Sequence, residues 1–433
     1  MKSFTLLIQP RDPMIVRDGR DFSAAPGAKA RGFDFPPPQV LAGAIRGQLG
    51  YALGYQPFAP RHEEQAVTLS CDEDAAGDLG RGAEWLALKQ KVSILGPLLY
   101  RLPKGVGGDE PGSTLQKGEV FYPAPLDAVL FKDRAKEEYQ LFRLSPPPIE
   151  DCKGLKTTPV LSNLPFEYFV EAPTEMPKDK PESMPRFWRG ELFIDWLLGK
   201  VENGESFANK EEMGFEGLPH DRRTHVKIER AAQTAEEHML FETDGLVFAS
   251  GEEGRLAWVD DISLLLRVEA DGLGEGEERL RAALNGVKPL GGKRRLALWE
   301  VVEEDPFTSS PPDELIEEIA RTRRAKVVLL TPADFNTQGN DRPYVPKGGD
   351  FGGAKIKAAA IGRPLVVSGW DILRGKPKCS RRLVPAGSVY FVDLCEVSDI
   401  EAWVKAHWLK MLAHQPEQSR RDGYGLVVVG VWG

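Results

Sequence analysis

Two glycines followed by three cations form the first candidate binding site in the sequence. The residues are Gly291, Gly292, Lys293, Arg294 and Arg295. Adjacent glycines let the backbone adopt positive φ and let another group come close. Backbone N–H groups in such a turn, next to Lys and Arg side chains, can hold a phosphate group. A plain hairpin turn is the alternative interpretation of this pattern.

A second glycine-basic stretch lies near the end of the chain, with Arg420, Arg421, Gly423 and Gly425. In both places a predicted strand and a predicted helix precede the loop, and a strand follows it. The first unit has a strand at 262–268 and a helix at 276–285, whereas the second has a strand at 388–394, a helix at 399–413 and a closing strand at 426–432. A unit that occurs twice with the same loop chemistry indicates two related half-domains.

Residues 221–228 have the pattern of a strand with one basic side and one apolar side. The basic side carries Arg223, His225 and Lys227, and the apolar side carries Thr224, Val226 and Ile228. Successive side chains of a strand point to opposite faces. We therefore expect the apolar side to lie over a core and the basic side to face an anionic ligand.

Further basic residues are candidates for the same ligand: Arg17, Arg46, Arg363, Arg381 and Arg382. Arg17 lies in a loop, 15–22, where Arg and Asp alternate around a glycine, so ion pairs within the loop are the alternative. Arg46 lies off the apolar stripe of a predicted amphipathic helix, 39–53, and a solvated side chain is its alternative. The other three belong to the densest basic part of the chain.

Catalytic chemistry is sparse in this sequence. His225 beside Arg and Lys can serve a metal-independent RNA cleavage as general acid or base, and hydrogen bonding or stacking is the alternative. His220, His225 and His238 with Glu236 and Glu237 match no zinc spacing. Nucleophile-elbow, Walker, zincin and Rossmann motifs do not occur. We expect no catalytic residue, no metal and no cofactor.

The overall composition limits which class of protein this chain can belong to. The 433 residues carry a net charge of −9, which argues against binding to nucleic acid by overall charge but allows a local basic surface. The four cysteines lack CxxC spacing and indicate neither a disulfide scaffold nor a zinc site. The apolar part of residues 1–8 is too short for a signal peptide, and no run reaches transmembrane length. We expect a cytoplasmic protein.

Other parts of the chain are predicted from composition and periodicity. Strands are expected at 4–8, 93–100 and 325–331, and a short aromatic helix at 188–198. Thr243, Asp244 and Gly245 have the composition of a turn, which predicts a hairpin over 239–249. The acidic, proline-containing stretch 303–324 is interpreted as a connector between domains.

Motifs spread over nearly the whole chain resemble one known family. They are RDPMIVRDGRDF, PPPQVLAGAIRGQL, ILGPLLYRLP, VFYPAPLDAVLF, DRRTHVKIERAAQTAEEHMLFETDGLVF, PLGGKRRLALW, VLLTPADF, AAAIGRPLVVSGWD, GKPKCSRRLVPAGSVYF and DGYGLVVVGVW. Together they resemble the RAMP superfamily of CRISPR-Cas proteins, and within it the family of the third Cmr subunit of type III-B RNA-guided interference complexes. The weakest matches are 56–90 and 145–220.

The resemblance implies an α+β fold of two tandem ferredoxin-like (RRM-like) domains with large insertions and glycine-rich loops. The domains would cover 1–305 and 306–433, with insertions at about 56–90 and 145–220. It also implies a non-catalytic subunit that binds the 5′ tag of the guide crRNA. Its partners would be the large polymerase/cyclase-type subunit and a backbone RAMP subunit, with target RNA involved indirectly. The complex would act in antiviral defence against foreign RNA and DNA.

Two departures from the family pattern bear on the site. Lys293 stands where the family often has an acidic residue, which favours phosphate binding or a more solvated loop. The loop at 423–425 has fewer glycines than the fullest superfamily pattern. Two other functions stay open at this point: an endoribonuclease that processes crRNA precursors, with His225 as its catalytic residue, and a scaffold that binds protein and no RNA.

Overall fold

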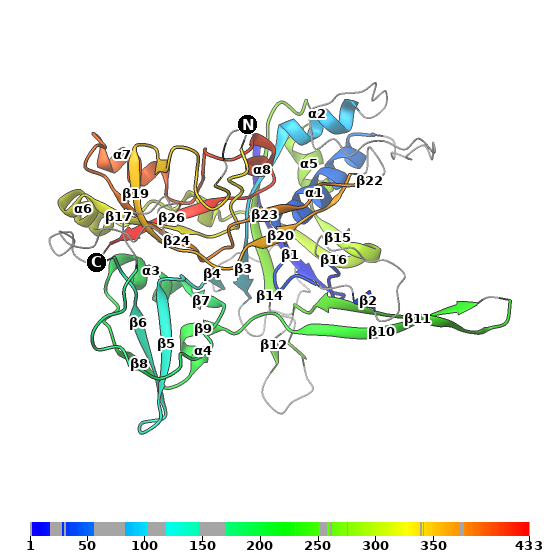
Figure 1. The fold of residues 1–433 in the computed structure, drawn as a ribbon. Helices are drawn as coiled ribbons and strands as arrows, with labels where there is room; N and C mark the ends of the chain where they lie inside the picture. The colour runs from blue at the N-terminus through cyan, green and yellow to red at the C-terminus, as the bar shows by residue number, and fades with distance from the viewer. Residues whose placement is uncertain are drawn as a thin grey trace. The chain divides into compact units, whose positions relative to one another are not determined.

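The structure of this chain is a computed structural model (Figure 1). It describes residues 2–17, 28–29, 32–55, 83–102, 118–146, 170–229, 231–248, 250–251, 258–259, 262–274, 276–337, 340, 342–371 and 376–432. Much of the predicted insertions 56–90 and 145–220, and residues 18–22 of the loop with alternating Arg and Asp, lie outside the described residues.

The chain forms two compact units, each assembled from three segments. Unit 1 contains Met1–Ile94, Leu218–Glu303 and Val366–Arg382, and unit 2 contains Leu95–Gly217, Glu304–Leu365 and Leu383–Gly433. Both contain helices together with mainly antiparallel sheets, which confirms the α+β class. The two ferredoxin-like domains, divided at residue 305, stay a prediction. Residues 95–217 belong to unit 2, together with the later part of the chain.

The main sheet of unit 1 is antiparallel, with β1 (Lys2–Pro10) between β14 (Ile262–Ala270) and β16 (Arg295–Val302). Leu6 lies opposite Leu266 on one side and Val301 on the other. β15 (Gly286–Leu290) pairs with β16 at the other side of that strand. The strands predicted at 4–8 and 262–268 are confirmed. β1 is buried from Phe4 to Pro10, and strands pair with both of its edges.

The α-helices of unit 1 in the described ranges are α1 (Pro38–Ala52), α2 (Ala83–Lys91) and α5 (Glu277–Ala283). α1 packs against α2, α5 and β15, and its side chains Leu41, Ile45 and Leu49 are fully buried. Proline at its first position suits a helix start, because the missing N–H would have no intrahelical partner. The helices predicted at 39–53 and 276–285 are confirmed.

A long two-stranded ribbon of β10 (His220–Glu229) and β11 (Thr234–Leu246) also belongs to unit 1 (Figure 1). β2 (Ala28–Lys29) adds a short parallel strand to β11, and β12 (Ser250–Gly251) pairs with β13 (Trp258–Val259). The prediction of a turn at Thr243-Asp244-Gly245 is wrong, since these residues pair within β11. A Cβ at Gly245 would lie 2.9 Å from Pro13 Cβ, so close approach explains this glycine.

The main sheet of unit 2 is antiparallel around β17 (Arg324–Leu329), which pairs with β24 (Val389–Asp393) and β26 (Leu426–Val431). The full order is β18-β19-β24-β17-β26-β25, which adds β18 (Asp350–Phe351), β19 (Ala354–Ala360) and β25 (Lys410–Met411). The strands predicted at 325–331, 388–394 and 426–432 are confirmed. The helix predicted at 399–413 is shorter, because α7 (Ile400–Ala406) ends before Leu409, whose φ is 51°.

The first segment of unit 2 adds two smaller strand groups. β3 (Val92–Arg101), which begins in unit 1, pairs with β4 (Glu119–Pro123), followed by β7 (Phe187–Arg189) and β9 (Gly214–Phe215). β5 (Ala128–Asp133), β6 (Glu138–Arg143) and β8 (Glu205–Phe207) form a separate sheet. Helices α3 (Gly190–Leu198) and α4 (Lys210–Met213) complete the segment. The strand at 93–100 is confirmed, and the aromatic helix predicted at 188–198 begins at 190.

A fully buried ion pair joins two segments of unit 2. Lys326 Nζ on β17 lies 2.9 Å from Asp127 Oδ2, and both side chains are at most 1% exposed. Trp196 Nε1 on α3 donates to Asp127 Oδ1 at 2.9 Å. Burial, together with the charge of Arg143, lowers the pKa of Lys326 to about 7, against which Asp127 acts in the opposite direction. The pair ties α3 and the β4–β5 connection to the central strand.

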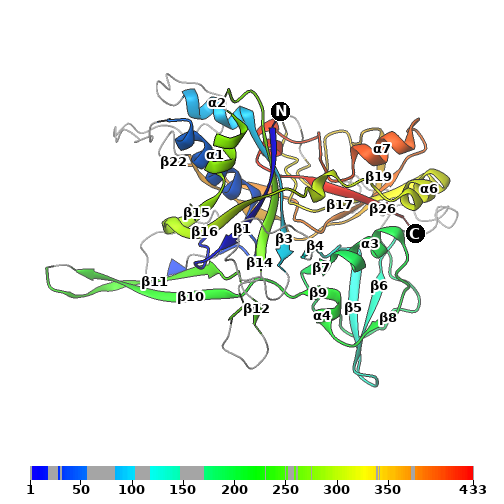
Figure 2. The ribbon, with the colours of Figure 1, turned by 180° about the vertical axis from the view of Figure 1, so that it is seen from behind.

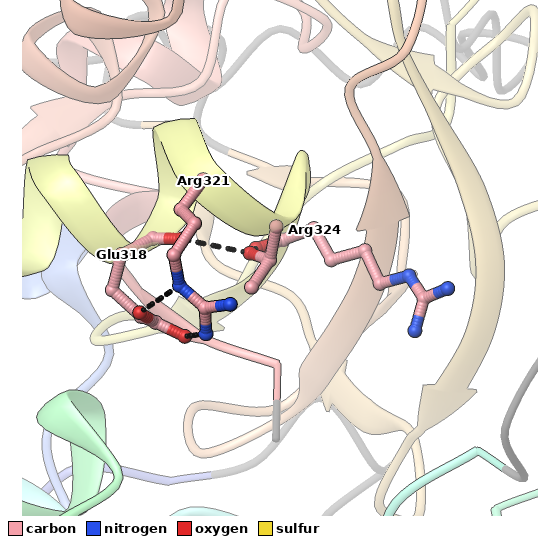
Figure 3. A network of polar contacts seen from close by, with 4 residues as sticks. Glu318, Arg321 and Arg324 are labelled. Carbon is pink, nitrogen blue, oxygen red and sulfur yellow. Dashed lines mark hydrogen bonds and ion pairs between the residues drawn. The ribbon is translucent and has the colours of Figure 1, made fainter.

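The stretch predicted as a connector, 303–324, contains a short 3₁₀ turn (Pro306–Thr308) and a helix, α6 (Asp313–Thr322). Leu315 and Ile319 of α6 are fully buried, so the acidic composition reflects only its solvent side. Its last turn is shown in Figure 3, where Arg321 Nε donates to Glu318 Oε2 at 2.9 Å and Arg324 begins the next strand. The hydrogen bond from Arg321 lowers the pKa of Glu318.

The hairpin 365–383 is built from β20 (Leu365–Val367) and β23 (Arg381–Leu383), with β21 (Trp370–Asp371) and β22 (Lys376–Pro377) nearer its tip. The remaining helix, α8 (Glu417–Arg421), precedes β26. Within the described ranges, the helices are all too short or too polar to be membrane spans.

Candidate nucleic-acid interface

The glycine-basic loop 291–295 is the turn between β15 and β16. Leu290 and Arg295 form the last pair of the two strands, and Gly291 has φ 72°. Gly292 N donates to Ile15 O at 2.8 Å, which anchors the loop to the segment after β1. A Cβ at Gly291 would lie 3.0 Å from Ile15 O, so glycine is needed for this approach. The strand 286–290 before the loop was not predicted.

Lys293 and Arg294 adopt the left-handed conformation, with φ of 57° and 51°. Residues with a Cβ reach this region at a cost of roughly 1 kcal/mol each. Residues 291–294 are all exposed, and Arg295 is half-buried. The loop therefore presents two cationic side chains to solvent on a backbone that is held in a strained, fixed shape.

Arg17 lies on the segment that anchors this loop. Met14 N donates to Leu246 O at 2.8 Å and Leu246 N donates to Met14 O at 2.9 Å, so the same segment is also bonded to the end of β11. Arg17 is exposed and forms a backbone bridge with Gly32. The structure thus connects the loop 291–295, Arg17 and the base of the β10–β11 ribbon through residues 14–17.

On the ribbon, His225 is placed by two residues of β11. His225 Nε2 lies 2.8 Å from Thr243 Oγ1, and its ring stacks on Phe241 with centroids 5.1 Å apart. These two residues were not identified from sequence, and the wrong turn prediction at 243–245 hid their register. Correct pairing of β10 with β11 would have found them, since His225 is opposite Phe241.

Arg223 and Lys227 flank His225 on the ribbon and are exposed. Arg223 Nε donates to Asp221 Oδ2 at 2.8 Å, and this carboxylate raises the pKa of Arg223 further above its usual range. At the base of the ribbon, His220 Nδ1 lies 2.7 Å from Asp244 Oδ1. These contacts hold the base of the ribbon, while Arg223 and Lys227 keep solvent access.

The apolar side of β10 does not lie over a core, so that expectation is wrong. Val226 is 41% exposed, Ile228 is 51% exposed, and Leu240, opposite Val226 on β11, is 56% exposed. The pairing of β10 with β11 shifts between Val226 and Ile228, so the predicted alternation over 221–228 is interrupted there. β10 belongs to a projecting two-stranded ribbon rather than to a covered sheet (Figure 2). Alternation fixes which residues share a face and does not tell whether a layer covers it.

Arg46 is neither solvated nor available on the surface. It is 7% exposed, and its Nε and Nη2 donate to Val92 O at 3.1 and 2.7 Å. The guanidinium therefore links α1 to the start of β3 inside unit 1. This use explains a buried arginine, because the charged group keeps strong hydrogen bonds. We leave Arg46 out of the proposed interface.

The remaining basic candidates divide between the units. Arg381 belongs to unit 1, and its Nη2 donates to Gln39 Oε1 at 3.1 Å, whereas Arg382 is exposed. Arg363 is exposed and belongs to unit 2. The structure therefore groups Arg381 and Arg382 with the unit that carries the loop 291–295, and places Arg363 in the other.

The second glycine-basic stretch has a different structure from the first. Arg420 and Arg421 lie in α8, and Arg421 Nη2 donates to Glu417 Oε1 at 2.5 Å. Gly423 and Gly425 have φ of 95° and 78° and are buried. Gly425 N donates to Pro332 O at 2.7 Å, and Gly423 O accepts from Thr331 Oγ1 at 2.8 Å. These backbone groups serve the unit's own interior.

Among the described residues, no group of three or more His, Cys, Asp or Glu is arranged to hold a metal ion. The side chains of Glu236, Glu237 and His238, part of the metal pattern considered above, are outside the described residues. The exposed candidate side chains of the loop 291–295 and of the ribbon are cationic, and His225 beside them makes a hydrogen bond and a stacking contact. Such a set suits binding of an anionic polymer with bases, because cations contact phosphates and rings contact bases.

The chain therefore has the α+β build and the exposed cationic loop of a protein suited to an anionic ligand. It belongs to the CRISPR-associated protein family Cas_Cmr3, whose family pattern matches residues 6–432. The resemblance to a CRISPR-associated Cmr family is thereby confirmed, whereas membership of the RAMP superfamily stays a prediction. A search among curated proteins finds no match.

Solved structures that are similar to this chain include two of a Cmr complex. One is a chain from a cryo-EM structure of the Type III-B Cmr-beta bound to cognate target RNA and AMPPnP, at 16% identity and a TM-score of 0.44, covering 89% of this chain and 86% of that one. The other is from the Type III-B Cmr-beta bound to cognate target RNA, at 15% identity and a TM-score of 0.44, with the same coverage of 89% and 86%.

Proposed function

We propose that this chain is a non-catalytic subunit of a type III-B CRISPR effector complex that binds the 5′ tag of the guide crRNA. It links the large polymerase/cyclase-type subunit to the backbone subunits, in defence against foreign RNA and DNA. Family membership supports the assignment to a CRISPR system. The observation that carries the RNA-binding role is the exposed loop 291–294, held open by its bond to Ile15.

The interface we propose is the surface around residues 14–17 in unit 1. Lys293, Arg294 and Arg17 supply phosphate contacts, and the ribbon adds Arg223, His225 and Lys227. Single-stranded RNA is held by backbone contacts together with bases placed on rings or in pockets. A net charge of −9 fits a subunit that contacts a short RNA segment and meets proteins over much of its remaining surface.

The ferredoxin-like architecture belongs to the same proposal. In unit 1 the strand order is β16-β1-β14, and β3 follows β14; a helix follows β1 and another follows β14. In unit 2 the order β26-β17-β24-β19 repeats this arrangement, with α7 after β24. The repeated order supports two related β-α-β-β-α-β units, the second without a helix between its first two strands in the described residues.

Salt-dependent RNA binding by the full chain in its assembled complex tests this role. Replacing Lys293 and Arg294 together with Ala removes two phosphate contacts, so the slope of log affinity against log salt becomes shallower by about one to one and a half. We expect affinity for a guide RNA with its 5′ tag to fall at low salt. A precursor RNA incubated with the same protein remains uncut, in keeping with a non-catalytic subunit.

The matched control is the double variant Arg134→Ala and Lys136→Ala. Both residues are exposed in the turn between β5 and β6 of unit 2, and their loss removes the same charge. The control leaves the slope at the wild-type value. An unchanged slope for the Lys293 and Arg294 variant, or an equal effect of the control, contradicts the proposal.

A further inference from the structure

The hairpin segment 366–382 of unit 1 holds an aromatic side chain in an open position. Trp370 pairs with Pro377 across the hairpin, and Lys378 N donates to Gly369 O at 2.8 Å. Ser368 Oγ donates to Lys378 O at 2.9 Å. These bonds fix the backbone on both sides of Trp370, so its position does not depend on the exposed side chain itself.

The hairpin is also fastened to α1. Gln39 Nε2 donates to Ser368 O, and Arg381 Nη2 donates to Gln39 Oε1 at 3.1 Å. One glutamine at the start of α1 thus bonds to both arms of the hairpin and orients the indole relative to unit 1.

Trp370 is 61% exposed. Tryptophan carries a large apolar surface that is normally buried to a great extent, so an indole this open on a bonded backbone has its ring face available to a partner. The residue was not singled out from sequence, although it lies beside the densest basic stretch. That neighbourhood identifies the chemistry of the partner.

Basic residues dominate the segment around Trp370. In the described part of the hairpin that belongs to unit 1, the basic residues are Lys378, Arg381 and Arg382. The whole chain is acidic, with a net charge of −9. A partner that meets an exposed indole on a hairpin that also carries basic residues should have both negative charge and flat apolar rings, and single-stranded nucleic acid has both.

We propose that Trp370 stacks on a base of single-stranded RNA, while neighbouring cations contact the phosphates. This rests on the proposed RNA-binding function and adds a residue outside the loop 291–295 and the β10–β11 ribbon. Stacking on an aromatic side chain is tolerant of base identity, because every base has a π face. The hairpin therefore holds a nucleotide without reading its sequence.

Binding of two strands that differ only in their bases tests this inference. The probes are a fluorescein-labelled oligoadenylate and an abasic ribose-phosphate strand of the same length, titrated with the full chain. Trp370→Ala weakens binding of oligoadenylate roughly tenfold, as expected for loss of one stacked base. It leaves binding of the abasic strand and the salt slope unchanged, and Trp370→Phe keeps most of the affinity.

Tyr344→Ala is the matched control, since Tyr344 is a 37% exposed aromatic residue in unit 2. The inference is overturned if Trp370→Ala binds oligoadenylate with the same affinity as the wild-type protein. It is also overturned if the variant binds oligoadenylate and the abasic strand more weakly by the same factor. Loss of a neighbouring subunit from the purified complex with RNA binding intact also overturns it, in favour of a protein contact. If the Lys293 and Arg294 variant also binds normally, the RNA-binding function itself fails.

Discussion

The two glycine-basic stretches hold the same position before the last strand of a sheet and have opposite environments. Residues 291–294 are exposed and bond to Ile15 through one backbone N–H. Residues 422–425 are buried, and Gln415 Nε2 donates to Tyr424 O at 2.7 Å while Gln415 Oε1 accepts from Asp334 N at 2.8 Å. In the second stretch, the protein's own polar groups occupy the backbone that a ligand would need.

This difference shows that glycine has two uses that look alike in sequence. In the first loop, glycine lets the turn approach a neighbouring carbonyl while the cations that follow remain in solvent. In the second, glycine makes room for a buried glutamine, and Arg421 pairs with Glu417 along a short helix. Similar composition thus forms an exposed cationic loop in unit 1 and an interior junction in unit 2.

Among the variants that test this comparison, Gly425→Ala has the largest expected effect. The new Cβ would lie 2.0 Å from Nε2 of Gln415, which is itself buried and hydrogen-bonded, and the residue has φ 78°. We expect a loss of about 3 kcal/mol or more in the free energy of unfolding. Urea unfolding measures it.

Gly274→Ala is the control for that variant, because a Cβ there meets nothing within 4 Å. Its free energy of unfolding stays near the wild-type value. A Gly425→Ala protein of wild-type stability would show that the second loop is as open as the first, and the comparison would break.

A second test uses the buried Lys326, which lies beside the closing strand of unit 2: a Cβ at Gly430 would be 3.0 Å from Lys326 Cε. Because the folded pKa is about 7 and the ordinary value is 10.5, the unfolded chain binds more protons between these values. Stability therefore rises with pH in that window, by about 2 kcal/mol from pH 7 to pH 9.

The control for the pH effect is the double variant Lys326→Met and Asp127→Asn. Asn keeps an oxygen that can accept from Trp196 Nε1, and no ionisable pair remains. We expect the free energy of unfolding of this variant to lack the increase between pH 7 and pH 9 that Lys326 causes in the wild-type protein. Denaturation at pH 7, 8 and 9 measures the difference. A rise of equal size in both proteins would assign the pH dependence to other groups.

The smallest test concerns the strain of the first loop. Lys293→Gly relieves a positive φ of 57°, and we expect stability to increase by up to about 1 kcal/mol while RNA binding weakens. Lys293→Ala loses the same charge and keeps the strain, so it weakens binding without the gain in stability. Thermal unfolding and RNA titration together separate the two effects. A loss of stability in Lys293→Gly would contradict the strained conformation.

Periodicity predicted the central strands of the two main sheets, and individual contacts explain where it failed. Residues 327–330 form an apolar run within the predicted strand 325–331, and β17 is found at the centre of a sheet. Gly245 was misread because a turn and a close contact with Pro13 require the same residue type. α6 was hidden by acidic residues on its solvent side, although Leu315 and Ile319 have helical spacing.

The candidate site was predictable in its charged residues and not in its geometry. The cations of 291–295 are on the surface as expected, whereas Arg46 is buried against a carbonyl from β3 that is distant in sequence. Thr243 and Phe241 became recognisable only with the register of the ribbon. A tertiary contact between distant segments leaves no local pattern, so these residues needed the structure.

The pairing of β1 also has a consequence during synthesis of the chain. β1 (Lys2–Pro10) lies between β14 and β16, which end at Ala270 and Val302. At ribosomal rates, the apolar strand waits roughly 15–60 s for its second neighbour. During that interval its unpaired edges resemble those that promote association between chains. Chaperones that bind nascent chains would protect this strand. In cells that lack those chaperones, slow-growing cultures should yield more aggregated protein than fast-growing ones. In cells that keep them, no such difference is expected.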